Sequence, residues 1–239
     1  MVTYSKQETI DRINKSLQTP PIDNLYNEGF INWAGKTKDT KEYYTEVLAY
    51  ELLDNLTLLH SIRSISRKNP YKIIDHRNIN IDLTSNRGED IFAKRLAYLE
   101  IENLGKILDY QIPLKNIQKD KAGDIDLVSF NKERNTFHLI ELKYENNNET
   151  LLRAILEIFT YYKVVDINRL LQSFPQENVD VNKIKVIPTV LVAENENCRP
   201  YKELEEMTFS GERPILKALS LALGVEFYSI TIDTSQYEL

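Results

Sequence analysis

The chain has 239 residues, 42% of them hydrophobic and 28% charged, with a net charge of −6. A chain this acidic excludes a protein that coats nucleic acid through its overall charge, although a local basic groove stays open. The single cysteine, Cys198, excludes a disulfide within the chain and suits a reducing compartment. Without a run of 18 apolar residues or an apolar N-terminal leader, the sequence predicts a soluble cytoplasmic protein that makes no contact with a membrane.

Residues 1–85 carry mainly helical patterns. Ser5 followed by Glu8 is a capping box, which predicts a helix beginning near residue 6. A turn and a short helix are expected next. Residues 40–67 then place apolar side chains at helical spacing, which predicts one long amphipathic helix. The segment 73–83 fits a strand and a loop equally well.

From residue 86 onward, helical and strand patterns alternate. Helices are expected over 89–105, 149–172 and 212–224, and strands over 106–114, 183–194, 225–233 and, as a pair joined by the turn 131–135, within 122–145. This order predicts an α/β fold with a mixed β-sheet flanked by helices.

The paired strands within 122–145 carry charges that a sheet core disfavours. Alternate residues of a strand face the same side, so Asp124 and Asp126 share one face of the first strand. Glu141 and Lys143 likewise share one face of the second strand. In an antiparallel hairpin whose paired residue numbers sum to 267, Asp126 lies across from Glu141, whereas a sum of 266 separates the charges onto opposite faces. The turn alone leaves both registers open.

In the first register, the two carboxylates repel each other unless a cation neutralises them. Mg²⁺ takes oxygen ligands, often one or two carboxylates together with water or phosphate. A lysine at the same place could orient a metal-bound water or stabilise the charge of a phosphate. The pattern therefore fits metal-dependent hydrolysis of a phosphodiester bond.

The segments "GDIDLV" and "LIELK" resemble the PD-(D/E)XK nuclease superfamily, whose fold is restriction-endonuclease-like. The resemblance covers about residues 86–235. It implies that Asp126 and Glu141 bind Mg²⁺ or Mn²⁺, with the Leu142 carbonyl as a further ligand, and that Lys143 positions the attacking water. The segment "RGEDIFAKRLAYL" is similar to the family's first core helix and implies that Glu89 supports the metal, although an acid in a first helical turn also suits the helix dipole.

Three more residues have a looser link to this site. Glu157 and Tyr161 have the spacing of a Gln and Tyr pair that several branches of the family carry, with Glu in place of Gln, and both also fit the edge of a core. Asp124 fits either a second metal ligand or a solvated residue at the start of a strand. Ile125 stands where the family often has Pro.

The helical patterns predict an N-terminal helical region over 1–85, which the resemblance leaves unexplained, and the resemblance implies a nuclease-like core over 86–239. The implied activity is that of a Mg²⁺- or Mn²⁺-dependent endonuclease or exonuclease acting on DNA or, less often, RNA. A two-fold homodimer would suit the cutting of both strands. The alternatives are a nuclease fold without catalysis that binds nucleic acid or a protein, and a structural domain whose charges only keep a strand face soluble.

Two groups of basic residues could bind phosphates, or could simply be solvated. They are Arg63, Arg67, Lys68, Lys72 and Arg77 in the first group, and Lys115, Lys119 and Lys121 in the second. The histidines, His60, His76 and His138, have no spacing typical of metal ligands.

Overall fold

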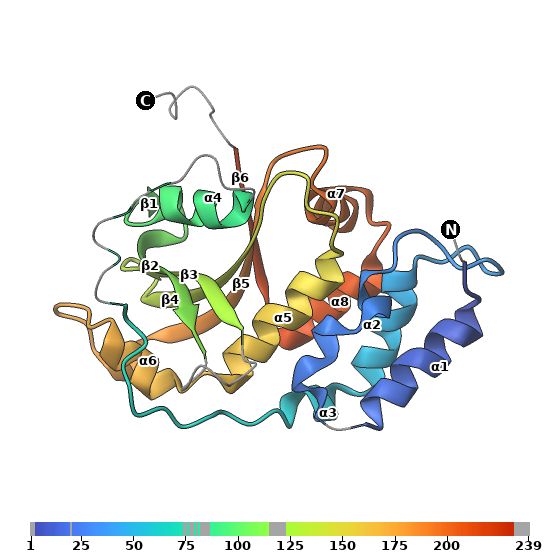
Figure 1. Ribbon diagram of the computed structural model, residues 1–239, viewed down its shortest axis with the longest axis horizontal. Coiled ribbons are helices and arrows are strands. Elements are labelled where there is room, and N and C mark those ends of the chain that lie inside the picture. Colours follow the sequence, from blue (N-terminus) through green and yellow to red (C-terminus); the bar gives the residue numbers. More distant parts are fainter. Residues whose placement is uncertain are drawn as a thin grey trace.

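The computed structural model describes residues 3–19, 21–73, 76, 79, 81, 87–114 and 123–231. It is an α/β protein, with a curled mixed sheet toward one end and the N-terminal helices toward the other (Figure 1). The fold class expected from the order of elements is therefore confirmed at this level. Most of the segment 73–83, which fitted strand and loop equally, lies outside the described residues.

The N-terminal region consists of short helices. They are α1 (Lys6–Leu17), the 3-10 helices η1 (Ile22–Asn27) and η2 (Gly29–Asn32), α2 (Tyr44–Asp54) and α3 (Leu56–His60). The predicted capping box is present, because the Ser5 side chain accepts the Glu8 N–H and the Glu8 carboxylate accepts the Ser5 N–H.

The prediction of a single long helix over 40–67 is wrong. The helix breaks at Asn55, whose side chain donates to the Glu51 carbonyl at 2.8 Å and so competes with the backbone ladder. Beyond His60 the chain is not helical, because a tertiary hydrogen bond from Ile65 N–H to the Val164 carbonyl, at 2.8 Å, replaces the helical one.

The sheet has six strands in the order of the chain. They are β1 (Glu100–Ile101), β2 (Gly105–Pro113), β3 (Asp124–Asn131), β4 (Thr136–Lys143), β5 (Lys185–Ala193) and β6 (Glu226–Ile230). The first four pair antiparallel, and β5 and β6 continue the sheet in parallel. Parallel neighbours need crossover connections, so helices lie between β4 and β5 and between β5 and β6.

The helices around the sheet partly match those expected. They are α4 (Gly88–Leu96), α5 (Leu151–Val164), α6 (Ile167–Ser173), η4 (Val181–Lys183), α7 (Arg199–Glu205), the π-helix η5 (Glu206–Ser210) and α8 (Pro214–Leu223). The helix expected over 149–172 is two helices, because Asp166 leaves helical geometry and caps α6 through the Arg169 N–H. The helix expected to reach residue 105 ends at Leu96, and α7, η5 and β1 were not foreseen.

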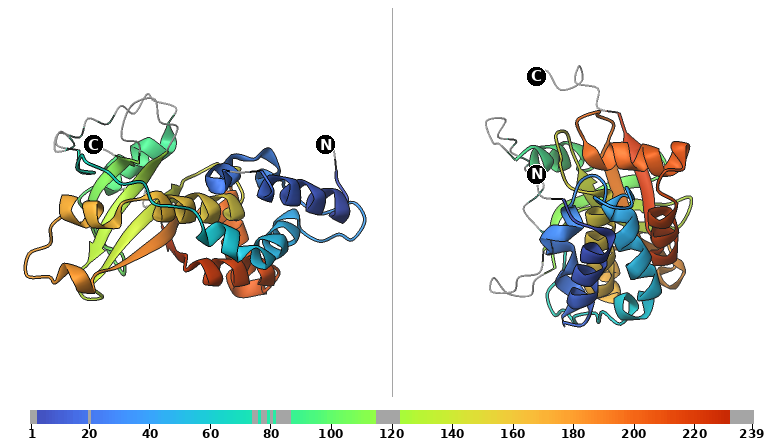
Figure 2. Two further views of the ribbon diagram at one scale, coloured as in Figure 1. Left: turned by 90° about the horizontal axis from the view of Figure 1, so that it is seen from below. Right: turned by 90° about the vertical axis from the view of Figure 1, so that its right-hand side faces the viewer.

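The two faces of the sheet pack against two separate hydrophobic clusters. Leu127, Ile140 and Leu142 pack with Phe92 and other residues of α4. Val128 and Leu139 belong to the larger cluster, which includes α5, α8 and the N-terminal helices. The N-terminal helices lie beside α5 and α8, on the far side from β1 and β2 (Figure 2). The face of β4 that carries Glu141 and Lys143 therefore turns toward α5.

Gly105, at the start of β2, provides a test of this packing. It has a positive φ of 76°, and a Cβ at this position would collide with the Phe130 carbonyl oxygen. Gly224 has a similar φ of 67°, but nothing lies within 4 Å of a Cβ there. We predict that Gly105→Ala lowers the free energy of unfolding by about 3 kcal/mol, against about 1 kcal/mol for Gly224→Ala, measured by urea denaturation. Equal losses would show that the approach of β2 to β3 is not tight.

Candidate active site

The register of the β3–β4 hairpin decides whether the charged residues meet. The pairs Leu127 with Ile140 and Val128 with Leu139 both sum to 267, so the register that gathers the charges is confirmed. The pairing ends at Leu127 with Ile140, so Asp126 and Glu141 stand just beyond the last pair of this register. Asp126 also accepts the Leu142 N–H at 2.8 Å through Oδ2, which joins the start of β3 to the end of β4.

Lys143 lies among three carboxylates at the end of β4. Its Nζ is 2.8 Å from Glu141 Oε1, 2.6 Å from Glu149 Oε2 and 3.9 Å from Glu157 Oε2. Glu141 and Lys143 are 5% and 3% exposed, so these charges are almost wholly removed from water. Buried charges persist only when they are paired, and here the carboxylates outnumber the lysine.

The pKa values of the cluster reflect this imbalance. Burial raises the pKa of Asp126 to about 7, although Lys143 and the Leu142 N–H act against the rise. Burial also raises the pKa of Glu141 well above its usual value, and repulsion from Asp126 and Glu157 adds to the rise. Burial by itself would lower the pKa of Lys143, but the surrounding carboxylates outweigh it and hold the pKa well above its usual value. The cluster therefore favours any added positive charge.

The other residues expected at the site lie at different distances from this centre. Glu89 of α4 is half-buried, and its Oε1 accepts the Asn147 side-chain amide at 2.6 Å and the Tyr144 N–H at 3.3 Å. Its charge also contributes to the raised pKa of Asp126, which places it near that carboxylate. In this structure Glu89 holds the loop that follows β4.

Glu157 and Tyr161 are both buried on α5, with the Tyr161 hydroxyl donating to Glu157 Oε1 at 2.9 Å. Asp124 is exposed at the start of β3, opposite Pro113, and takes no part in the ion pairs around Lys143. The structure therefore brings Glu157 into the cluster and leaves Asp124 outside it.

Two residues of the charged cluster around Lys143, Glu149 and Arg153, were not predicted from the sequence. Arg153 Nε lies 2.9 Å from Glu149 Oε1 and 3.7 Å from Glu157 Oε2, in ionic contact rather than in an aligned hydrogen bond. Arg153 and Glu157 lie one turn apart on one side of α5, and Glu149, four residues before Arg153, stands just ahead of this helix. That spacing was a readable signal of an ion-pair row beside the lysine.

The structure limits how a metal ion could be held. Among the described residues, no group of three or more His, Cys, Asp or Glu side chains is arranged to hold one. A bound ion would therefore depend on Asp126 and Glu141, with water or phosphate oxygens completing its shell, as Mg²⁺ accepts. His138 is buried and contacts the Thr189 hydroxyl at 2.9 Å, and His76 contacts Asp109 at 2.7 Å.

Part of the first basic group has a structural use. The Arg67 guanidinium donates to the carbonyls of Asn69, Pro70 and Pro113 and lies 4.2 Å from the centre of the Tyr71 ring. It therefore fastens the segment after α3 to the end of β2. Arg77 and the second basic group, Lys115, Lys119 and Lys121, lie outside the described residues.

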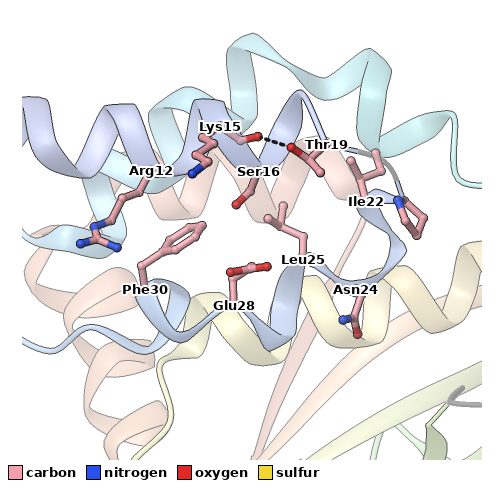
Figure 3. Close-up of a pocket in the computed structure, with 10 residues that line it drawn as sticks. Arg12, Lys15, Ser16, Thr19, Ile22, Asn24, Leu25, Glu28 and Phe30 are labelled. Atoms are coloured by element: carbon pink, nitrogen blue, oxygen red, sulfur yellow. Dashed lines mark hydrogen bonds between the residues drawn. The ribbon is translucent and has the colours of Figure 1, made fainter.

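In the described part of the chain, the N-terminal region lines several cavities. The one in Figure 3 has a volume of about 490 Å³, lies between α1 and η1, and is lined by none of the site residues expected from the sequence. Arg12, Lys15 and Glu28 give it mixed charge. A second cavity of about 390 Å³ is lined by Tyr26 and Tyr161. It adjoins the charged cluster around Lys143, because the Tyr161 hydroxyl donates to Glu157.

No protein-family model, curated protein or solved structure matches this chain. No helix in the described part of the chain has the length and apolar character needed to cross a bilayer.

The raised pKa of Asp126 makes the stability of the metal-free protein depend on pH. The folded protein holds this proton up to about pH 7, whereas the unfolded chain releases it near pH 3.8. Its contribution to stability is thus complete below about pH 4 and is lost as the pH rises to about 7. Between pH 5 and pH 8 in EDTA, the free energy of unfolding of wild type should therefore fall by roughly 3 kcal/mol relative to that of Asp126→Asn.

Urea denaturation across this pH range measures the difference. The exposed Asp124→Asn, two residues earlier on the same strand, is the control. A difference between wild type and Asp126→Asn that stays constant with pH would contradict the burial of this carboxylate charge.

Proposed function

We propose that this protein is a Mg²⁺- or Mn²⁺-dependent nuclease of the PD-(D/E)XK superfamily, with a restriction-endonuclease-like fold, that hydrolyses phosphodiester bonds of DNA or RNA. The observation that carries the proposal is the meeting of Asp126, Glu141 and Lys143 at one end of the β3–β4 hairpin. A buried acidic pair beside a lysine has little value for stability, since replacing buried ion pairs with apolar residues is often neutral or favourable. Perturbed groups of this kind are more frequent at functional sites.

The topology supports the same proposal. A helix, antiparallel strands, a second helix and a parallel strand occur in the chain order α4, β2, β3, β4, α5 and β5, with the short strand β1 between α4 and β2 and with α6 and η4 between α5 and β5. The sequence predicted a mixed sheet flanked by helices from its order of elements, whereas the nuclease-like core was implied by the motifs around Asp126, Glu141 and Glu89. Fold alone does not imply activity, so the argument depends on the residues at the strand ends.

The residues of the cluster have distinct tasks in this reaction. Asp126 and Glu141 would hold the cation, and the Asp126–Leu142 hydrogen bond fixes how far apart these two strands lie. A cation held there by Asp126 and Glu141 would supply Lewis-acid chemistry to the phosphate and would lower the pKa of water. Lys143 would orient the water that attacks phosphorus and stabilise the negative charge on the phosphate oxygens. The strand-borne carboxylates keep a fixed geometry, as a precise site requires.

Cleavage assays test the proposal. Supercoiled plasmid, single-stranded DNA and single-stranded RNA are each incubated with Mg²⁺ or Mn²⁺ and wild-type protein. We expect cleavage that EDTA abolishes and that Lys143→Ala reduces by at least ~100-fold. The matched control is Lys132→Ala, an exposed lysine in the turn at the other end of the hairpin, which should cleave like wild type. Cleavage that survives both EDTA and Lys143→Ala would refute the mechanism.

Calorimetry separates the enzyme from the alternative without catalysis. Mn²⁺ should bind the wild type and bind Asp126→Asn or Glu141→Gln much more weakly. Nucleic acid binding with neither Mn²⁺ binding nor cleavage would identify a binding module in place of an enzyme.

A further inference from the structure

Glu149 is the ion-pair partner that lies nearest to the Lys143 ammonium, and it belongs to neither strand of the hairpin. One of its oxygens, Oε2, lies 2.6 Å from Lys143 Nζ. The other, Oε1, lies 2.9 Å from Arg153 Nε, one turn into α5. The carboxylate thus bridges the last residue of β4 and the first turn of α5 with a different oxygen on each side.

The backbone around Glu149 is fixed from both directions. Its N–H donates to Asn147 Oδ1 at 2.9 Å, and the Asn147 amide donates to Glu89. On the other side Thr150 caps α5 by accepting the Arg153 N–H at 3.1 Å, and its hydroxyl donates to the Ile31 carbonyl at 2.7 Å. Glu149 is therefore held in place before any ligand arrives, although its side chain is 27% exposed.

Cation binding would change the partners of Lys143. An ammonium group donates three hydrogen bonds, and here its nearest acceptors are Glu141 and Glu149. A divalent cation on Asp126 and Glu141 competes with the ammonium for the oxygens of Glu141 and repels it. Glu157, at 3.9 Å, is too distant to replace that contact. Only Glu149 then keeps a short contact with Lys143.

We propose that Glu149 is a positioning residue of the site, which holds the Lys143 ammonium beside Glu141 when a divalent cation occupies the carboxylate pair. Arg153 fixes its second oxygen, and the Glu89–Asn147 contact fixes its backbone. The inference rests on the proposed nuclease function and adds a residue to its machinery. It also gives Glu89 a second role, since Glu89 helps through Asn147 to hold the backbone of Glu149.

Kinetics of Glu149→Gln provide the first test. This variant keeps the shape of the side chain and removes its charge. With a labelled oligonucleotide and saturating Mg²⁺, kcat should fall ~10- to 100-fold while KM and Mn²⁺ affinity stay at wild-type values. Glu145→Gln, in the same loop, is the matched control and should keep wild-type kcat. A wild-type kcat in Glu149→Gln, or an equal change in KM with a lowered melting temperature, would overturn the proposal.

A second measurement does not depend on turnover. In ¹⁵N-labelled protein with Mg²⁺, the Lys143 ammonium resonance is identified by its loss in Lys143→Arg. It should persist in wild type, Glu145→Gln and Glu141→Gln, and disappear in Glu149→Gln as the released ammonium exchanges with water. Its persistence in Glu149→Gln would show that Glu149 is not the anchor. If the wild type cleaves no nucleic acid, the nuclease function fails, while this spectrum still decides whether Glu149 holds Lys143.

Discussion

The pairing of β3 with β4 is the constraint on which the rest of the site depends. Side chains alternate along a strand, so a slip of one residue would move Asp126 to the α4 face and leave Glu141 and Lys143 on the α5 face. The apolar residues of both strands specify the register, because Leu127 and Ile140 share one buried cluster while Val128 and Leu139 share the other. The position of the carboxylates is thus a consequence of hydrophobic packing on both sides of the sheet.

The N-terminal region, whose role the sequence left open, supports the helix that faces the site. Thr150, the cap of α5, bonds to Ile31 and Asn32 of η2, and the Tyr26 ring of η1 meets Tyr161 edge-on at 5.7 Å. Glu46 of α2 accepts two N–H groups at the start of α8, at 3.0 and 2.8 Å. Buried Glu203 accepts the Leu151 N–H at 2.8 Å and contacts Arg199 and Arg213. Through the contacts of η1 and η2 with Thr150 and Tyr161, the N-terminal region helps to fix α5, which carries Glu157.

Local signals in the sequence predicted much of this architecture. The capping box, the strand alternation around Asp126 and Glu141, and the apolar stripe of α5 each depend on neighbouring residues, and each formed as expected. The failures have both distant and local causes. The chain after residue 40 is not helical beyond His60, where Ile65 bonds to the end of α5, but it already breaks at Asn55, and the helix expected over 149–172 divides at Asp166, in both cases through a local side-chain hydrogen bond. Glu149 was missed because its partner in space, Lys143, lies on another element.

The burial of β4 has a consequence for how the protein opens and closes. All eight of its residues are buried, with β3 bonded on one side and β5 paired along its whole length on the other. Strands of this kind exchange their amide protons only when a protein unfolds globally, whereas half-exposed loops open more often. We therefore expect Glu141 and Lys143 to belong to a slow-opening unit of the molecule. Any adjustment of the site during substrate entry would thus come from side chains, while the backbone of β4 keeps its pairing with β5.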